Sequence, residues 1–322
     1  MADILIAGCG AIGGLYAARL ARHARVTALD INAEHVAAIN RDGLQLSGAT
    51  ELVARIPAMS QAQQLRAHTF DAVIVAVKSM DTAALAQALK THLAGRPLVL
   101  TQQNGQGNVD TLLAAGDWDV AQGMTMEGAE VVAPGKVRHH VHGPLSVVGP
   151  ARGELGAMRW LGELLDAAGL PTRVVEDPRG AIWNKYLFNC AINPVAALLR
   201  GIPEAKYAND DVYGVLRALV DEGLAVARAL GIEVEGDPLH LLEDIRAGRR
   251  PLPRHPGSMA LDIERGTPTE IEALNGYLVR RADERGVPVP LQRAMYRLLR
   301  GLEFGMRAAR TPCAGGGAST PG

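Results

Sequence analysis

The glycine-rich stretch near the start of the chain constrains its fold more than any other feature. Asp3 to Ala7 (DILIA) form a short apolar run, which is typical of a strand buried on both faces. The turn Gly8–Gly14 (GCGAIGG) follows at once, and a helical stretch, Leu15 to Ala21, follows the turn. In this context G-x-G-x-x-G permits a tight turn, lets a pyrophosphate approach the backbone, and aims a helix N-terminus at the phosphates. The pattern predicts a dinucleotide site formed by Gly8, Cys9, Gly10, Ala11, Ile12 and Gly13.

The residue that ends the second predicted strand bears on the choice of dinucleotide. Asp30 follows the strand Arg25 to Leu29, about 20 positions past the glycines. A carboxylate at this corner hydrogen-bonds the ribose hydroxyls and would repel a 2′-phosphate, so we expect NADH to be preferred over NADPH. In the alternative interpretation, Asp30 only caps the helix predicted from Ala33 to Arg41.

Strand and helix patterns alternate as far as residue 176. We predict strands at 70–77, 98–101 and 120–123, short strands within 127–142 and at 145–148, and a last strand at 172–176. We predict helices at 81–93, 109–115 and 153–169, and a hairpin at 44–56. This order predicts an α/β, Rossmann-type doubly wound domain over residues 1–176. Ligands bind beyond the carboxyl ends of the strands in such a sheet, and Lys78 and Asn104 follow two of them, so both should face the cofactor. The alternative for Lys78 is a solvated surface lysine.

No strand-like run appears from Asp177 onward. Helical patterns occupy 181–194, 210–231, 239–247, 271–285 and 290–310. They predict an all-helical domain over residues 177–310. The tail 311–322 is rich in Gly, Ser, Thr and Pro, and we expect it to be flexible.

Several polar residues in the predicted helical domain are candidates for a catalytic or ligand-binding role. Lys185, Asn189 and Asn193 are four residues apart, which places them on one face of an otherwise apolar helix. The alternative is a partly exposed helix with solvated polar groups. Glu270 should lie in the first turn of its helix, where Thr267-x-x-Glu270 also matches a capping box.

Composition excludes several classes of protein. A net charge of -1 gives no electrostatic reason to expect nucleic acid or an anionic membrane as a partner, and no apolar run is long enough to span a membrane. Three scattered cysteines favour a reducing, cytoplasmic location. His139, His140 and His142 suggest a metal, but alternation places His139 on the opposite face from the other two, and we found no nearby acid to complete a ligand set. We therefore predict no metal site.

Taken together, these motifs resemble the ketopantoate reductase (2-dehydropantoate 2-reductase) family. The matching features are, in the family's order, GCGAIGG, Lys78, Gln103-Asn104-Gly105, Trp183-Asn184-Lys185 with Asn189-Cys190 and Ile192-Asn193-Pro194, Ser258-Met259 with Asp262-Ile263, and Thr269-Glu270-Ile271 with Asn275-Gly276. They cover nearly the whole chain. The block around Lys185 combined with Glu270 is specific, whereas the glycine loop alone is not.

The resemblance implies reduction of the C2 ketone of ketopantoate to (R)-pantoate, a step toward pantothenate and coenzyme A, at a site between two domains. It implies that Lys185 protonates the nascent alkoxide as hydride arrives from the nicotinamide. It implies that Glu270 orients this lysine and contacts the substrate or the nicotinamide ribose. Asn189, Asn193 and Ser258 would bind the substrate, a small 2-keto acid.

One departure and several alternatives remain open. The family commonly has a basic residue where Asp30 stands. This difference leaves two questions open: whether the cofactor is NADH or NADPH, and whether the substrate is another 2-keto acid. A β-hydroxyacid dehydrogenase shares the two-domain plan and a helical Lys-x-x-x-Asn pair. The Asn193-Pro194 continuation and the pair Ser258 and Glu270 fit the ketopantoate reductase resemblance better. A dinucleotide-binding sensor without catalysis would have no reason to keep the lysine, the amides and the carboxylate. The sequence does not determine the oligomeric state, and a homodimer is the one assembly that we consider.

Overall fold

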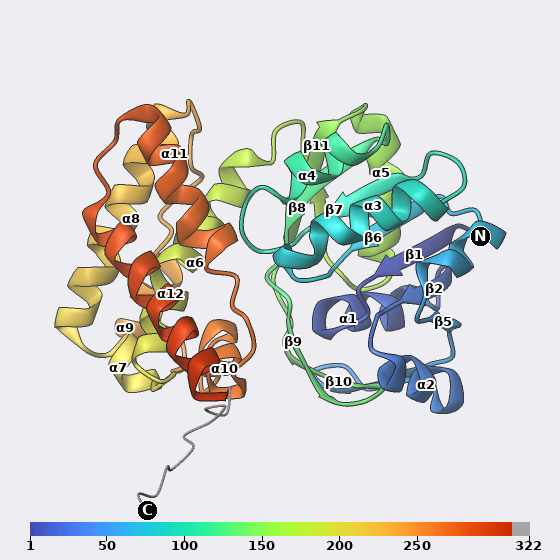
Figure 1. Ribbon diagram of the computed structural model, residues 1–322, viewed down its shortest axis with the longest axis horizontal. Helices are drawn as coiled ribbons and strands as arrows, with labels where there is room; N and C mark the ends of the chain where they lie inside the picture. Colours follow the sequence, from blue (N-terminus) through green and yellow to red (C-terminus); the bar gives the residue numbers. More distant parts are fainter. Residues whose placement is uncertain (311–322) are drawn as a thin grey trace, which may run out of the picture. The chain divides into compact units, whose positions relative to one another are not determined.

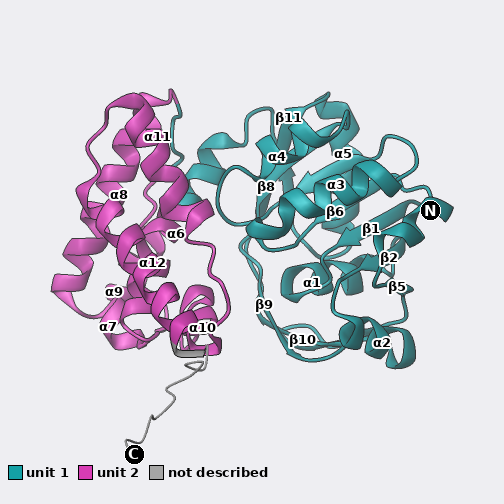
Figure 2. Ribbon diagram, viewed as in Figure 1, with its two compact units in different colours: residues 1–186, 232–235 teal, residues 187–231, 236–322 magenta. Residues whose placement is uncertain are grey.

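The computed structural model describes residues 1–310, so the predicted flexible tail, 311–322, lies outside the described residues. The predicted fold class, a doubly wound α/β domain followed by helices, is confirmed. The chain divides into two compact units (Figure 2), the first made of residues 1–186 and 232–235, the second of 187–231 and 236 onward. This division lies ten residues after the domain boundary that we predicted at residue 176. No helix of the described part is long and apolar enough to cross a membrane.

The first unit is built on an eight-stranded sheet (Figure 1). Across the sheet the strands are β12 (Thr172–Val174), β11 (Ser146–Arg152), β8 (Val120–Met124), β7 (Leu98–Thr101), β6 (Ala72–Val75), β1 (Asp3–Ala7), β2 (Arg25–Leu29) and β5 (Ala58–Met59). Every neighbouring pair is parallel except β11 and β8. The carboxyl ends of β1, β6, β7 and β8 therefore lie at one edge of the sheet. The chain order reverses between β1 and β6, which is where ligands bind in sheets of this kind.

Both faces of the large sheet are covered by helices. Its helices are α1 (Ala11–Leu20), α2 (Ala33–Asp42), α3 (Thr82–His92), α4 (Asn108–Ala115) and α5 (Leu155–Ala167), with short 3-10 turns η1 (Ala62–Ala67) and η2 (Ser79–Asp81). Side chains of β1 alternate between two apolar clusters: Ile4 and Ile6 pack with α1 and α5, whereas Leu5 and Ala7 pack with α3 and α4. Burial of both faces explains why these strands read as continuous apolar runs.

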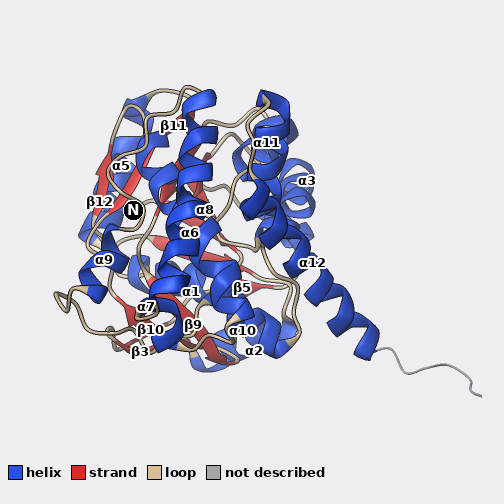
Figure 3. Ribbon diagram, turned by 90° about the vertical axis from the view of Figure 1, so that its left-hand side faces the viewer, coloured by secondary structure: helices blue, strands red, loops and turns tan. Residues whose placement is uncertain are grey.

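A second, smaller sheet contains the predicted hairpin. Its strands, in order, are β4 (Leu52–Ala54), β3 (Leu44–Gly48), β10 (Lys136–Val141) and β9 (Gly128–Ala133), drawn in red with the other strands in Figure 3. β3 and β4 pair antiparallel, which confirms the hairpin. The parallel pairing of β3 with β10 joins segments about ninety residues apart, and no local pattern in either segment predicts it.

The described residues of the second unit form helices joined by loops, without a strand. Its elements are the end of α6 (Arg179–Leu198), α7 (Pro203–Tyr207), α8 (Asp210–Ala229), α9 (His240–Arg246), α10 (Ser258–Arg265), η3 (Glu272–Gly276), α11 (Tyr277–Arg285) and α12 (Pro290–Arg310). We did not predict α7 or α10, which are only five and eight residues long. The single helix predicted over 271–285 is wrong at its start, because η3 is a π-helical turn in which Leu274 has non-helical angles (φ -91, ψ -106).

Pro194 lies inside helix α6, where a proline is normally disruptive. Since Pro194 has no N–H, the carbonyl of Cys190 one turn earlier loses its helical donor. The side chain of Asn275, fully buried in η3, donates to that carbonyl at 2.8 Å and to the Gln292 side chain at 2.6 Å. Gln292 in turn donates to the carbonyl of Leu219 at 2.9 Å. This chain of hydrogen bonds ties α6, η3, α12 and α8 together and compensates for the proline.

A second buried polar group stabilises the segment that leads into α10. Lys206, at the end of α7, is 2 % exposed and donates to the carbonyls of His255 and Pro256 at 3.1 and 2.9 Å. Its ammonium also lies over the ring of Tyr207. Burial lowers the pKa of Lys206 from 10.5 to about 8, because the charged form loses hydration.

Replacing Asn275 by Ala should lower the free energy of unfolding by about 2–4 kcal/mol, because two buried groups lose a donor. The cost should fall by about 1 kcal/mol or more in a Pro194→Ala background, where residue 194 supplies an N–H to Cys190. The coupling between the two substitutions is measured by denaturant unfolding of the native protein, Asn275→Ala, Pro194→Ala and the double variant. Asn184→Ala is a matched control, since that amide also donates to a carbonyl, of Glu235, but at an exposed position. Strictly additive effects of the two substitutions would contradict the compensation.

Lys206 should make stability depend on alkaline pH in a defined direction. Because the pKa of Lys206 is lowered in the folded protein, the unfolded chain binds more protons between about pH 8 and 10.5. The free energy of unfolding of the native protein, relative to that of Lys206→Met, should therefore rise across this window, by at most about 3 kcal/mol. The lost hydrogen bonds to His255 and Pro256 add a difference that does not depend on pH. A difference that stays constant or falls with pH would show that Lys206 is not desolvated.

Candidate active site

The glycine loop has the geometry of a phosphate cradle. Gly8 has φ +94, and a Cβ there would lie 2.6 Å from the backbone nitrogen of Val77; at Gly13 it would lie 1.8 Å from the Gly8 carbonyl. At Gly10 a Cβ would meet nothing within 4 Å. Gly8 and Gly13 are therefore required by close packing, whereas Gly10 faces open space at the start of α1. No side chain caps that helix, so its first N–H groups are available to an anion.

Asp30 lies against this loop. Its carboxylate accepts hydrogen bonds from the backbone N–H of Cys9 and of Asn32, each at 2.9 Å. The alternative role that we considered, capping of α2, belongs instead to Asn32, whose side chain accepts from the N–H of His35 at 3.0 Å. The Cys9 thiol is fully buried and its pKa is raised to about 12, mainly by burial. The Cys9 thiol is therefore closed to a ligand, and the Cys9 backbone is held by Asp30 and His35.

The loops after β6 and β7 are held to each other. The side chain of Gln103 donates to the Val77 carbonyl at 2.7 Å, and the hydroxyl of Ser79 donates to the Asn104 carbonyl at 2.8 Å. These bonds place exposed Lys78 and half-buried Asn104 in adjacent loops at the edge that carries the glycine loop. Lys78 and Asn104, which we predicted to face the cofactor, therefore lie in adjacent loops at this edge.

Lys185 projects from α6 toward the carboxyl end of β8. Its ammonium donates to the backbone carbonyl of Thr125 at 2.6 Å, and Thr125 directly follows Met124, the last residue of β8. Thr125 is itself buried and fixed: its hydroxyl accepts from the Ser146 hydroxyl at 3.0 Å and from the N–H of Glu127 at 3.2 Å. We did not single out Thr125 from the sequence, although its position after a buried strand was a usable signal.

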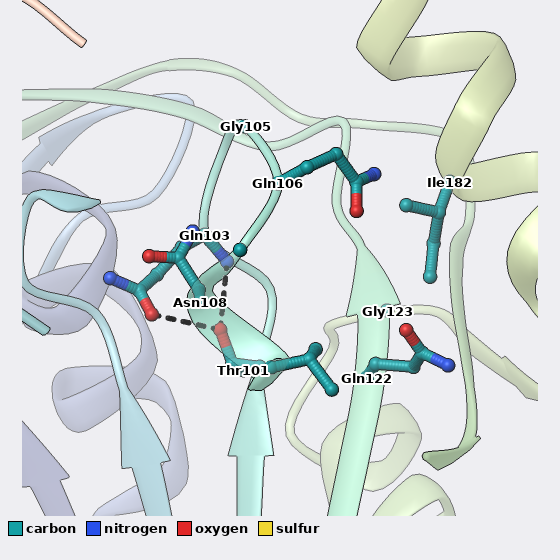
Figure 4. A pocket seen from close by; sticks show the side chains of 10 residues that line it. Thr101, Gln103, Gly105, Gln106, Asn108, Gln122, Gly123 and Ile182 are labelled. Carbon is teal, nitrogen blue, oxygen red and sulfur yellow. Dashed lines mark hydrogen bonds between the residues drawn. The ribbon is translucent and has the colours of Figure 1, made fainter. Parts of the chain in front are cut away.

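A small pocket opens at the same edge, where β7 and β8 end (Figure 4). It is lined by Thr101, Gln103, Gly105, Gln106, Gly107, Asn108, Val109, Gln122, Gly123 and Ile182. The figure shows the side chains of Gln106, Gln122 and Ile182 around the opening. The amide nitrogen of Gln106 is buried and has no hydrogen-bond partner among the described residues. It is therefore a donor that an acceptor atom of a bound ligand could use.

The second unit holds the remaining predicted site residues. Asn189 is buried and Asn193 half-buried on α6, and Ser258 is the first residue of α10. The turn before Ser258 rests on α6, since a Cβ at Gly257 would lie 3.6 Å from that of Ala196.

Glu270 lies in a bend before η3 and not in the first turn of a helix as we predicted. Its backbone carbonyl accepts from the N–H groups of Ala273 and Leu274. The capping-box alternative is wrong, because the Thr267 hydroxyl points back to the Asp262 carbonyl of α10. The neighbouring Thr269 is fixed by two hydrogen bonds to Glu303, so the bend is well anchored.

The histidines near β10 differ from our expectation. His139 and His142, which we placed on opposite faces, both contact the carboxylate of Glu127. Strand β10 ends at Val141, and its pairing with β9 is irregular between His139 and Val141, so simple alternation does not extend to His142. Our premise that no acid lies nearby is also wrong, since Glu127 is twelve residues earlier in sequence but adjacent in space.

Comparison with known proteins identifies the family. Residues 4–152 match the family described as "Ketopantoate reductase PanE/ApbA", and residues 177–303 match "Ketopantoate reductase PanE/ApbA C terminal". A 2-dehydropantoate 2-reductase of Pyrococcus abyssi is 30% identical over 302 residues, covering 93% of this chain and 97% of the relative. One from Halobacterium salinarum is 33% identical over 302 residues, covering 92% and 97%.

Solved structures agree with these matches. A PanE/ApbA family ketopantoate reductase from Ralstonia eutropha JMP134 has a TM-score of 0.84 at 34% identity, covering 95% of this chain and 99% of that one. D-mandelate dehydrogenase with NADH and anilino(oxo)acetate has a TM-score of 0.87 at 24% identity, with coverage of 95% and 99%, and this similarity concerns the fold alone. On the sequence matches over nearly its whole length, the chain belongs to the ketopantoate reductase family.

Proposed function

We propose that this protein reduces the C2 ketone of 2-dehydropantoate to (R)-pantoate with a nicotinamide dinucleotide. The observation that carries the proposal is the Lys185 ammonium, held by Thr125 at the carboxyl edge of the sheet. The glycine loop, Lys78 and Asn104 lie in the loops that follow strands β1, β6 and β7, which end at this edge. A phosphate cradle and a positioned proton donor at one sheet edge are what a ketone reductase needs.

The residues present fit a dinucleotide. The open space at Gly10 and the uncapped start of α1 suit a pyrophosphate, and Asp30 suits the ribose hydroxyls. Lys78 and Asn104 would face the nicotinamide side. The negative charge of Asp30 beside the loop disfavours a 2′-phosphate, so we propose NADH as the preferred form.

The protein's own contribution to the reaction is proton donation and charge stabilisation. A bound reduced nicotinamide supplies the hydride. As the ketone oxygen gains negative charge, Lys185 stabilises it and donates a proton, which gives the alcohol. An ammonium has three N–H donors, so the bond to Thr125 fixes the direction of the other two. For Asn189, Asn193 and Ser258 we propose hydrogen bonds to the 2-keto acid, and for Glu270 the role of second catalytic residue.

The substrate proposal is tested by initial rates of cofactor oxidation with ketopantoate, compared with 2-keto acids that carry other side chains, including phenylglyoxylate. The highest kcat/KM should be obtained with ketopantoate. A higher kcat/KM for another 2-keto acid would reassign the substrate and leave the reaction type intact. Tight cofactor binding without turnover of any 2-keto acid would support a sensor and refute the enzyme.

Lys185→Ala should lower kcat by about 10²–10⁴-fold, because the reaction loses its general acid. The Kd for the cofactor, measured by fluorescence titration, should stay nearly unchanged. Lys90→Ala, on helix α3, is a matched control for loss of a lysine. Unchanged turnover in Lys185→Ala would remove this residue from the mechanism.

Asp30→Arg should shift the ratio of kcat/KM values from NADH toward NADPH, because it replaces a repulsive charge by one that binds the 2′-phosphate. Asp30→Asn separates the two roles of the residue, since it removes the charge but keeps an acceptor for Cys9. It should weaken the preference without reversing it. Loss of the hydrogen bond between Asp30 and Cys9 would lower kcat/KM for NADH and for NADPH alike and leave their ratio unchanged. An unchanged ratio in both variants would therefore refute the claim that the charge of Asp30 sets the cofactor preference.

A further inference from the structure

Glu127, His139 and His142 form a cluster that the proposed reaction does not use. The Glu127 side chain lies in the turn between β8 and β9, with one carboxylate oxygen 2.7 Å from Nε2 of His139 and the other 3.0 Å from Nδ1 of His142. One nitrogen or oxygen from each residue lies within 4.8 Å of those of the other two. The three residues thus bring two imidazoles and a carboxylate to one point.

The cluster is buried on one side and accessible on the other. The His139 side chain is fully buried and that of Glu127 is 2% exposed, whereas that of His142 is 48% exposed. Packing therefore holds two of the three side chains, whereas the third is in contact with solvent.

A hydrogen bond on the far side of its ring also orients the buried His139. The other ring nitrogen of His139, Nδ1, lies 2.9 Å from the hydroxyl of Thr50, which in turn accepts a hydrogen bond from Arg19. A hydroxyl can donate or accept, so Thr50 suits His139 whichever ring nitrogen is protonated. A hydrogen bond to the distal nitrogen of a histidine is the usual support for a metal ligand.

We propose that Glu127, His139 and His142 bind a divalent transition-metal ion such as Zn²⁺. Two histidines and one carboxylate are a ligand set that zinc accepts, with a fourth position for water on the exposed side. Tetrahedral ligands of zinc lie about 3.3 Å apart, so Glu127 and His139 must separate by about half an ångström on binding. The metal replaces the proton that His139 Nε2 shares with Glu127 and with the Val141 carbonyl, 2.8 Å away.

Because of the position of the cluster, metal binding should stabilise the fold of the first unit. The N–H of Glu127 bonds to the Thr125 hydroxyl, and the Thr125 carbonyl accepts from Lys185. A metal on Glu127 would join the β8–β9 turn to the end of β10. We therefore expect binding to raise the midpoint temperature of unfolding, independently of any activity.

The test is titration of chelator-treated full-length protein with ZnCl₂ in a calorimeter, and with CoCl₂ followed by visible absorption. Native protein and His140→Ala should each bind one equivalent and show a raised Tm. His140 is the matched control because it neighbours His139 but is not in the cluster. His142→Ala and Glu127→Gln should weaken binding by more than about tenfold and abolish the rise in Tm. His142 is half-exposed, so its replacement should leave the fold intact.

Two results would overturn the proposal. The first is absence of stoichiometric binding by the native protein. The second is equal affinity in the native protein and in His142→Ala, which would indicate adventitious binding elsewhere on the surface. Either result would leave the proposed reductase activity untouched, because that activity depends on Lys185 and the glycine loop.

Discussion

The hydrogen bond from Lys185 to the carbonyl of Thr125 is the interaction on which the functional interpretation depends. It joins helix α6 to the end of strand β8, in the same sheet as β1, β6 and β7, which lead into the glycine loop, Lys78 and Asn104. An ammonium fixed on a backbone carbonyl has a defined direction, which a flexible lysine side chain lacks in solvent. The parallel sheet places the carboxyl ends of its central strands at one edge, and the carbonyl that orients the ammonium lies at that edge.

Helix α6, which carries Lys185, Asn189 and Asn193, contains a proline whose missing hydrogen bond is replaced from another segment. Pro194 removes an N–H from the Cys190 carbonyl, and Asn275 supplies a donor from a distant segment. The same buried amide network joins α8 and α12 to α6, so it fixes the segment that begins at Glu270. Proline and asparagine therefore form a matched pair, because the asparagine donates the hydrogen bond to Cys190 that the proline cannot donate.

The sequence predicted those features whose physical cause is local. Buried parallel strands read as apolar runs, and the glycine turn carries its own signature, so the first unit was predicted almost strand by strand. Partnerships across long separations were not predicted: Lys185 and Thr125 are 60 residues apart, and Asn275 and Cys190 are 85 apart. The cap of α2 also needed the structure, because only there does Asn32 rather than Asp30 accept from the N–H of His35. The histidine cluster was misjudged because strand alternation does not continue past an irregular strand end.

The most direct test of the central claim is the pH dependence of kcat for the native protein and for Lys185→Arg. If Lys185 is the proton donor, kcat of the native protein should fall at alkaline pH as the ammonium is lost. In Lys185→Arg, whose guanidinium remains protonated, the remaining activity should show no such fall. An alkaline fall that is the same in both proteins would show that another group donates the proton, and would contradict the assignment of Lys185.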